Sequence, residues 1–137
     1  MVNEEEIQQK YMQFQAMQQQ LEQISQHLEL LNQQNDELDI SINAVKELGN
    51  TKVDNELLAP IADGIFFKGV LKDNQKLIVN VGSDTTVEKT VPEVVKLLEE
   101  QKKDVSKRMI EVDAMMQDMS LQAMQLYQEV EESVKGE

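Results

Sequence analysis

The chain has 137 residues, a formal net charge of −13, no cysteine, eight methionines and 4% aromatic residues. An acidic chain repels phosphate backbones, which disfavours DNA or RNA binding, and without cysteine neither disulfides nor thiolate metal sites can form. The scarcity of large aromatic side chains and the abundance of methionine favour elongated helix packing over a conventional globular core.

The first segment, about residues 5–48, has the composition and spacing of a coiled-coil helix. It lacks Gly and Pro and is rich in Gln, Glu, Leu and Met, which favour helices. Apolar residues in two series, each advancing by seven, form the seam of a coiled coil. The series are Ile7, Phe14, Leu21, Leu28, Asn35, Ile42 and Met17, Ile24, Leu31, Leu38, Val45. Lys10 interrupts the second series, the polar Asn35 either fixes the register or is tolerated, and Gly49–Asn50 predicts the helix end.

The middle segment, about residues 51–91, loses the heptad and gains β-branched residues and short alternating runs. Asp63–Gly64 predicts a two-residue hairpin turn, because Gly adopts positive φ without penalty. Asp73–Asn74 and Gly82–Asp84 mark two further turns. We therefore expect two hairpins with strands at about 56–62, 65–71, 76–81 and 86–91.

Two isolated hairpins are marginally stable in water, and their unpaired edges invite strands from other chains. We therefore expect the hairpins of several subunits to assemble into an intersubunit β-barrel, which removes the edges. The residues expected at this assembly surface are Leu57, Leu58, Ile61, Ile65, Phe67, Leu77, Val79, Val81 and Val87.

The last segment, about residues 92–134, is a second coiled-coil helix. Pro92 suits its first turn, and Glu93 suits the same helix end. Its seam series are Leu98, Val105, Val112, Met119, Leu126 and Val95, Met109, Met116, Ala123, Val130, broken by Lys102. Two helices of nearly equal length, each about 60–65 Å at ~1.5 Å per residue, predict an antiparallel pair. The expected fold class is α+β: a long antiparallel two-helix coiled coil joined by two β-hairpins, as a single domain over residues 1–137.

The strand segment contains four distinctive runs, at Leu57–Ile61, Asp63–Phe66, Lys72–Gly82 and Val87–Thr90. These runs carry the specific part of a resemblance of the whole chain to the alpha class of prefoldin subunits, of the archaeal type. Ala59 stands where the family more often has Val, and Ser83–Thr85 replaces a Gly-rich turn.

The resemblance implies an ATP-independent chaperone subunit in a cytoplasmic hexamer of two alpha and four beta-class subunits. Its members hold unfolded client proteins at the coiled-coil tips and transfer them to a group II chaperonin. The alternative is a structural or filament-forming prefoldin paralogue without client transfer.

Near the free ends of both helices, apolar residues leave the seam, where a plain coiled coil would have polar ones. They are Met1, Val2, Tyr11, Met12, Met115, Leu121, Met124 and Tyr127. Methionine adapts to many apolar shapes, and promiscuous binders use such surfaces. We expect these residues to form a client-binding tip. Contact with a neighbouring coil, or tolerated exposure, is the alternative.

Enzymatic and membrane functions lack candidates in the sequence. His27 is the one histidine, there is no Walker-type loop, and acidic clusters are usually solvated faces. We therefore expect no enzyme, no catalytic residue, no metal and no cofactor. The acidic start at Glu4–Glu6 is unlike a secretory signal, and no apolar run approaches the ~18 residues needed to span a bilayer. These features predict a soluble, cytoplasmic protein that binds no membrane.

Overall fold

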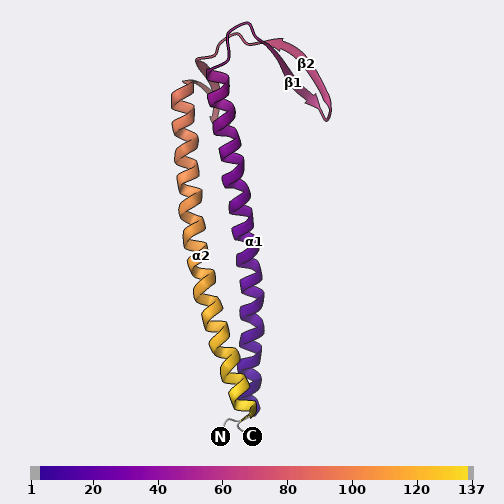
Figure 1. Ribbon diagram of the computed structural model, residues 1–137, viewed down its shortest axis with the longest axis vertical. Coiled ribbons are helices and arrows are strands. Elements are labelled where there is room, and N and C mark those ends of the chain that lie inside the picture. The colour runs from indigo at the N-terminus through magenta and orange to yellow at the C-terminus, as the bar shows by residue number, and fades with distance from the viewer. Residues whose placement is uncertain (1–3, 136–137) are drawn as a thin grey trace. The chain divides into compact units, whose positions relative to one another are not determined.

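The computed structural model describes residues 4–135 and shows two long helices joined by two hairpins (Figure 1). The elements are α1 (Glu4–Gly49), β1 (Glu56–Ala62), β2 (Ile65–Val70), β3 (Lys76–Gly82), β4 (Thr85–Thr90) and α2 (Val91–Lys135). The α+β fold of two helices and two hairpins is therefore confirmed. The chain forms two compact units, residues 4–35 with 104–135, and Asp36–Lys103. That residues 1–137 form a single domain stays a prediction.

The unit of residues 4–35 and 104–135 is an antiparallel helix pair (Figure 1). Lys10 Nζ lies 3.4 Å from Glu129 Oε2, and Ser106 Oγ lies 3.5 Å from Asn35 Oδ1, so rising numbers on α1 face falling numbers on α2. Every predicted seam residue of this unit is buried or partly buried, and Leu31 is the most buried at 2% exposure. Removal of this apolar stripe from water is the main force that holds the pair together.

The unit Asp36–Lys103 contains the other ends of the helices and both hairpins. Ile42 of α1 and Val94 of α2 are buried in it. Lys102, which interrupts the predicted seam, contacts the carboxylate of Asp39 on the facing helix. The interruption is therefore compensated by a charge on the opposite helix.

The helix ends facing the hairpins are closed by local hydrogen bonds. The Asn50 N–H donates to the carbonyls of Lys46 and Glu47, which ends α1. At the start of α2, the Thr90 hydroxyl donates to the Glu93 carboxylate at 3.0 Å and accepts the Glu93 N–H at 3.3 Å. The Thr90 hydroxyl therefore caps α2 by accepting one of the free N–H donors of its first turn.

Gly49 is the last residue of α1, at the helix end that the sequence predicts. It does not have positive φ, which among the glycines of residues 4–135 occurs at Gly64 and Gly82. A Cβ on Gly49 would lie 3.0 Å from Val91 Cγ1. The missing side chain thus permits a close approach of α1 and α2.

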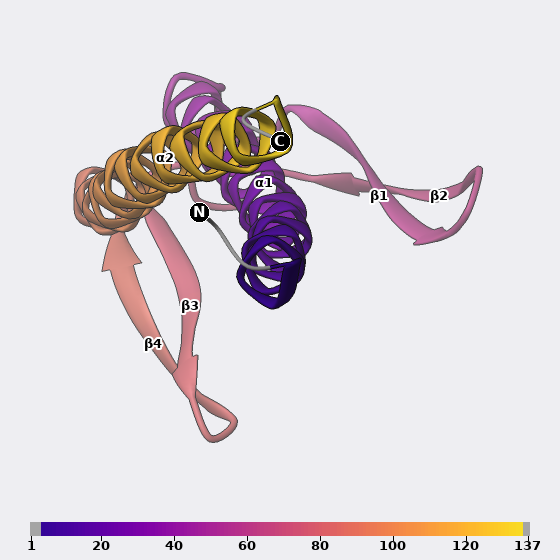
Figure 2. The same cartoon turned by 90° about the horizontal axis from the view of Figure 1, so that it is seen from below.

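The hairpins β1–β2 and β3–β4 are separate antiparallel two-stranded sheets (Figure 2). Asp63–Gly64 forms the predicted two-residue turn, with Gly64 at φ 76°. The third turn is shorter than expected, because Gly82 pairs with Thr85 and only Ser83 and Asp84 lie between them. Both of these residues have positive φ. Positive φ at both central residues is the type I′ pattern, which matches the twist of the strands.

The second hairpin repeats the first with a shift of twenty residues, as the pairs Glu56↔Val70 and Lys76↔Thr90 show. The same register shift precedes both turns. The same hydrogen bond also closes both bases: Leu71 N–H donates to Asn55 O, and Val91 N–H donates to Gln75 O, each at 2.9 Å. The two hairpins are therefore two copies of one structural unit.

Between the hairpins, Asp73 Oδ1 accepts the N–H groups of Gln75 at 2.8 Å and Lys76 at 3.1 Å. The Gln75 N–H, and then the Lys76 N–H, hold the pKa of Asp73 below its ordinary value of 3.8. Because the pKa is lower in the folded state, ionised Asp73 stabilises the fold above pH ~4, and this stabilisation is lost as the pH falls through the folded-state pKa.

We expect the wild-type protein to lose stability relative to the Asp73→Asn variant as the pH falls below 4, because Asn keeps the hydrogen-bond acceptor without titrating. Urea unfolding of both proteins between pH 6 and 2.5 tests this, and parallel pH profiles would contradict it.

Candidate functional site

Six of the predicted tip residues lie in the unit of residues 4–35 and 104–135, and all six are exposed. They are Tyr11, Met12, Met115, Leu121, Met124 and Tyr127, with between half and two thirds of each residue open to solvent. Met1 and Val2 lie outside the described residues. Large apolar side chains at this level of exposure are a feature of interaction surfaces when they gather in one place.

Two adjoining hollows bring part of this set together. The smaller has a volume of about 270 Å³ and the larger about 570 Å³. Phe14, Tyr127 and Glu131 line both hollows. We call the two hollows together the aromatic groove. Its further lining residues are Tyr11, Val130, Val134 and Lys135 in the smaller hollow and Gln18, Leu21, Ser120, Ala123, Met124 and Gln128 in the larger.

The wall shared by the two hollows is an aromatic pair. The ring centroids of Phe14 and Tyr127 are 5.4 Å apart and their planes are inclined by 42°. Such tilted pairs contribute about 0.5–1.5 kcal/mol beyond area burial. Phe14 belongs to the partly buried seam while Tyr127 is 52% exposed, so the pair anchors an exposed ring to the interior of the helix pair.

Sequence reasoning found some groove residues and missed others. Tyr11, Met124 and Tyr127 were predicted and line the groove, whereas Met12, Met115 and Leu121 are exposed without lining either hollow. The other ten lining residues were not predicted as site residues, and two of them are large apolar side chains that the tip set could have included. Phe14 was assigned to the seam alone, and the exposed Val134 carries the same off-seam signal as the predicted set.

The surroundings of the groove are acidic. Residues 4–22 and 118–135 hold eight carboxylates and two lysines. The lysines form salt bridges: Lys10 lies 3.4 Å from Glu129, and Lys135 lies 3.5 Å from Glu131, one helical turn away. The groove therefore has apolar walls within a field of negative charge.

The hairpins form a second candidate surface, in the unit Asp36–Lys103. Directly paired residues share a face, so Ala59 and Phe67 lie on one face of β1–β2, and Pro60 and Phe66 lie on the other. Apolar side chains thus occupy both faces of this hairpin. The predicted Leu57 lies on the face of Phe67, and the predicted Leu58 lies on the opposite face.

The hairpin β3–β4 has one apolar and one polar face. Val79 pairs with Val87 on the apolar face, which also carries Leu77. On the other face Ile78 pairs with Glu88, and polar residues surround them. The polar neighbours are Lys76, Asn80, Thr86 and Thr90.

The remaining assembly predictions are exposed strand residues, and one needs a correction. Ile61, Ile65 and Val81 are all more than half exposed. The expected alternation of Leu77, Val79 and Val81 on one face is interrupted, because the register of β3 shifts between Asn80 and Gly82. The exposed Phe66, Val70 and Ile78 were not in the predicted set.

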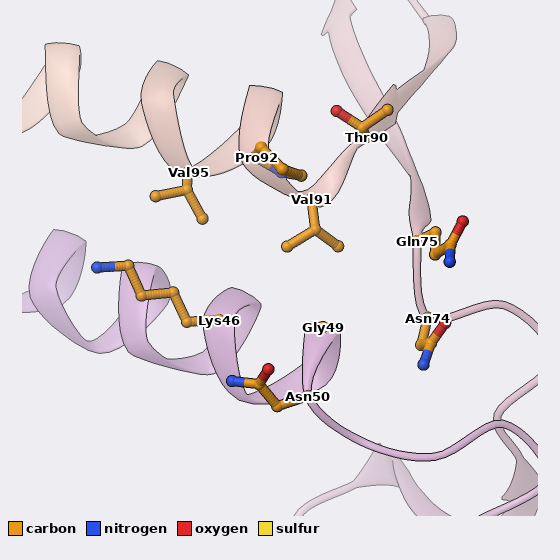
Figure 3. Close-up of a pocket in the computed structure, with 9 residues that line it drawn as sticks. All are labelled: Lys46, Gly49, Asn50, Asn74, Gln75, Thr90, Val91, Pro92 and Val95. Carbon is orange, nitrogen blue, oxygen red and sulfur yellow. The ribbon is translucent and has the colours of Figure 1, made fainter.

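A third hollow, of about 680 Å³, lies where the helix ends meet the base of β3–β4 (Figure 3). Val91 and Val95 of α2 point toward α1 in it, and Asn74 donates through Nδ2 to Thr51 O at 2.8 Å. In residues 4–135 no three His, Cys, Asp or Glu side chains are grouped to hold a metal ion, and neither helix has a segment long and apolar enough to cross a bilayer.

Comparison with known proteins agrees with this architecture. The family model described as "Prefoldin subunit" matches residues 17–136. Prefoldin subunit alpha of Pyrococcus horikoshii is 33% identical over 103 residues, which cover 74% of this chain and 70% of the relative. Prefoldin subunit alpha of Methanococcus aeolicus is 29% identical over 132 residues, 96% of this chain and 90% of the relative. A cryo-EM structure of filamentous PFD from Methanocaldococcus jannaschii has the same fold, with a TM-score of 0.75 at 18% identity over 84% of this chain and 95% of that one. The chain belongs to the prefoldin family of chaperone subunits.

Proposed function

We propose that this chain is the alpha-class subunit of an ATP-independent chaperone that holds unfolded proteins at the free ends of its helices. The aromatic groove is the observation that carries the proposal, because it gathers exposed apolar side chains in a hollowed surface. Family members are chaperone subunits, which agrees with a protein that binds polypeptides and catalyses no reaction.

The hairpins support assembly with other subunits, as a hexamer of two alpha and four beta-class subunits. Each hairpin has an apolar face and unpaired strand edges. A two-stranded hairpin of this kind is only marginally stable alone. Strands added from neighbouring subunits would close a β-barrel and bury both features. Of the predicted assembly residues, Leu77, Val79 and Val87 share the apolar face of β3–β4, and Leu57 and Phe67 share one face of β1–β2.

Client holding then depends on many weak contacts. Burial of one Leu or Met contributes only about 1.5–3 kcal/mol before ordering costs. Several helix tips contacting one flexible chain raise the effective concentration, which gives firm capture with easy release and no need for ATP. Release to a group II chaperonin in the cytoplasm completes the proposed role.

Replacing Tyr11, Met124 and Tyr127 with Ser is expected to weaken the holding of a denatured test protein by at least about tenfold. The three side chains supply apolar walls of the groove, and loss of ~1.4 kcal/mol corresponds to tenfold in affinity. Suppression of aggregation by the assembled complex measures this.

The matched control is Ile110→Ser, because Ile110 is 72% exposed on α2 but lines neither hollow. It should leave holding unchanged. A second triple variant, Met12, Met115 and Leu121 to Ser, tests the predicted residues outside the groove. Full holding by the groove variant would reject the groove as the client site.

A filament-forming paralogue is the second candidate, since one protein of the same fold is a filamentous PFD. Native mass spectrometry of the chain alone, and after co-expression with a beta-class subunit, separates the two. A defined hexamer formed only with the partner supports the chaperone, and polymers of the chain alone support the filament.

A further inference from the structure

We infer that the aromatic groove selects extended apolar client segments that carry lysine or arginine beside their apolar residues. The inference rests on the proposed function, because it names the class of polypeptide that the client site prefers. Three features of the groove support it: its length, its walls and the position of Glu131.

The groove is long enough for an extended chain. Its lining residues on α2 run from Ser120 to Lys135, which is about 22 Å at ~1.5 Å per residue. At ~3.3 Å per residue this length accommodates about six residues of extended polypeptide. The client would therefore be an unfolded segment, whose side chains alternate between the groove and solvent.

The walls of the groove can bind apolar side chains of different shapes. Met124 and Leu21 line the larger hollow, and Val130 and Val134 line the smaller. Methionine is flexible and polarisable, so it packs against varied partners. The exposed ring of Tyr127, which packs against Phe14, lines both hollows.

Glu131, the acidic residue of the groove, lines both hollows. It follows Tyr127 by one helical turn, so the two side chains are neighbours on the helix surface. A client Arg or Lys can contact the carboxylate and stack on the Tyr127 ring at the same time. The existing partner, Lys135, is an exposed intrahelical pair 3.5 Å away, and such pairs are weak enough to be exchanged.

The charge around the groove acts in the same direction. Eight carboxylates against two lysines in residues 4–22 and 118–135 attract basic segments and repel acidic ones. An acidic client segment would have to approach Glu131 and this field together. The groove thus discriminates by charge as well as by apolar contact.

The test uses short fluorescent peptides with one apolar core flanked by Lys, by Ser or by Glu, and the assembled complex of the full chain with beta-class subunits. Fluorescence anisotropy should show the highest affinity for the Lys-flanked peptide and the lowest for the Glu-flanked peptide, with the Ser-flanked peptide between them. The dissociation constants of the Lys and Glu peptides should differ by about tenfold at low salt. The difference should shrink as the ionic strength rises. Glu131→Gln should reduce the ratio of the affinities for the Lys and Ser peptides by about two- to fourfold.

Glu111→Gln is the matched control, because it removes the same charge from an exposed residue of α2 outside the groove. Equal binding of the three peptides, or equal effects of the two substitutions, would overturn the inference. Holding of a denatured protein without binding of any peptide would do the same. Failure to hold the denatured protein would instead overturn the proposed function.

Discussion

Changing Val79 to Asp is expected to abolish assembly with beta-class subunits, raising the dissociation constant by at least about a hundredfold. Val79 pairs with Val87 on the apolar face of β3–β4. In a closed barrel this face is enclosed, and an unpaired buried carboxylate costs several kcal/mol, whereas ~2.7 kcal/mol already gives a hundredfold. Native mass spectrometry after co-expression measures the loss.

The neighbouring residue supplies the control for this prediction. Ile78 is 75% exposed on the opposite face, where it pairs with Glu88. Ile78→Asp should therefore leave the complex intact. Circular dichroism should show unchanged helix content in both variants. Hexamers of normal abundance with the Val79 variant would contradict the proposed barrel.

Changing Leu31 to Ala is expected to lower the free energy of unfolding by about 3 kcal/mol. Leu31 is 2% exposed in the seam of the unit of residues 4–35 and 104–135. Truncation removes buried methyl groups and leaves a cavity that two straight helices fill only in part. Urea unfolding followed by circular dichroism gives the change.

The adjacent Leu30 supplies the control, because it allows the same Leu→Ala substitution at an exposed position. Leu30 is 51% exposed and lies off the seam, so Leu30→Ala should change the free energy of unfolding by less than about 0.5 kcal/mol. Alanine also favours helix slightly over leucine. Similar losses for the two variants would show that the seam is assigned to the wrong face.

The sequence was sufficient for the elements and for the buried face of each helix. A heptad is a local pattern, and it places Leu31 inside and Leu30 outside without reference to any other segment. The Asp63–Gly64 turn is equally local, because positive φ at Gly64 follows from the residue type. Both features depend on neighbours along the chain, which a single sequence contains.

Features that depend on which residues meet across the helix pair were not predictable. Whether Lys102 contacts Asp39 depends on how the two helices are aligned along their axes, and the heptads leave this alignment open by whole turns. The close approach at Gly49 depends on the same alignment. The aromatic groove requires in addition the side-chain directions of Phe14 and Tyr127, so the exposed tip residues were predicted as a set but not as a groove.

The twenty-residue spacing of the hairpins means that one of them can be removed as a unit. Asn55 and Gln75 accept equivalent hydrogen bonds, so residues 56–75 begin and end at corresponding points of the two copies. Excision of that segment joins Asn55 to Lys76 in a local setting that the chain already uses. Such a deletion would leave one hairpin, closed by its own base hydrogen bond, between two helices of unchanged length.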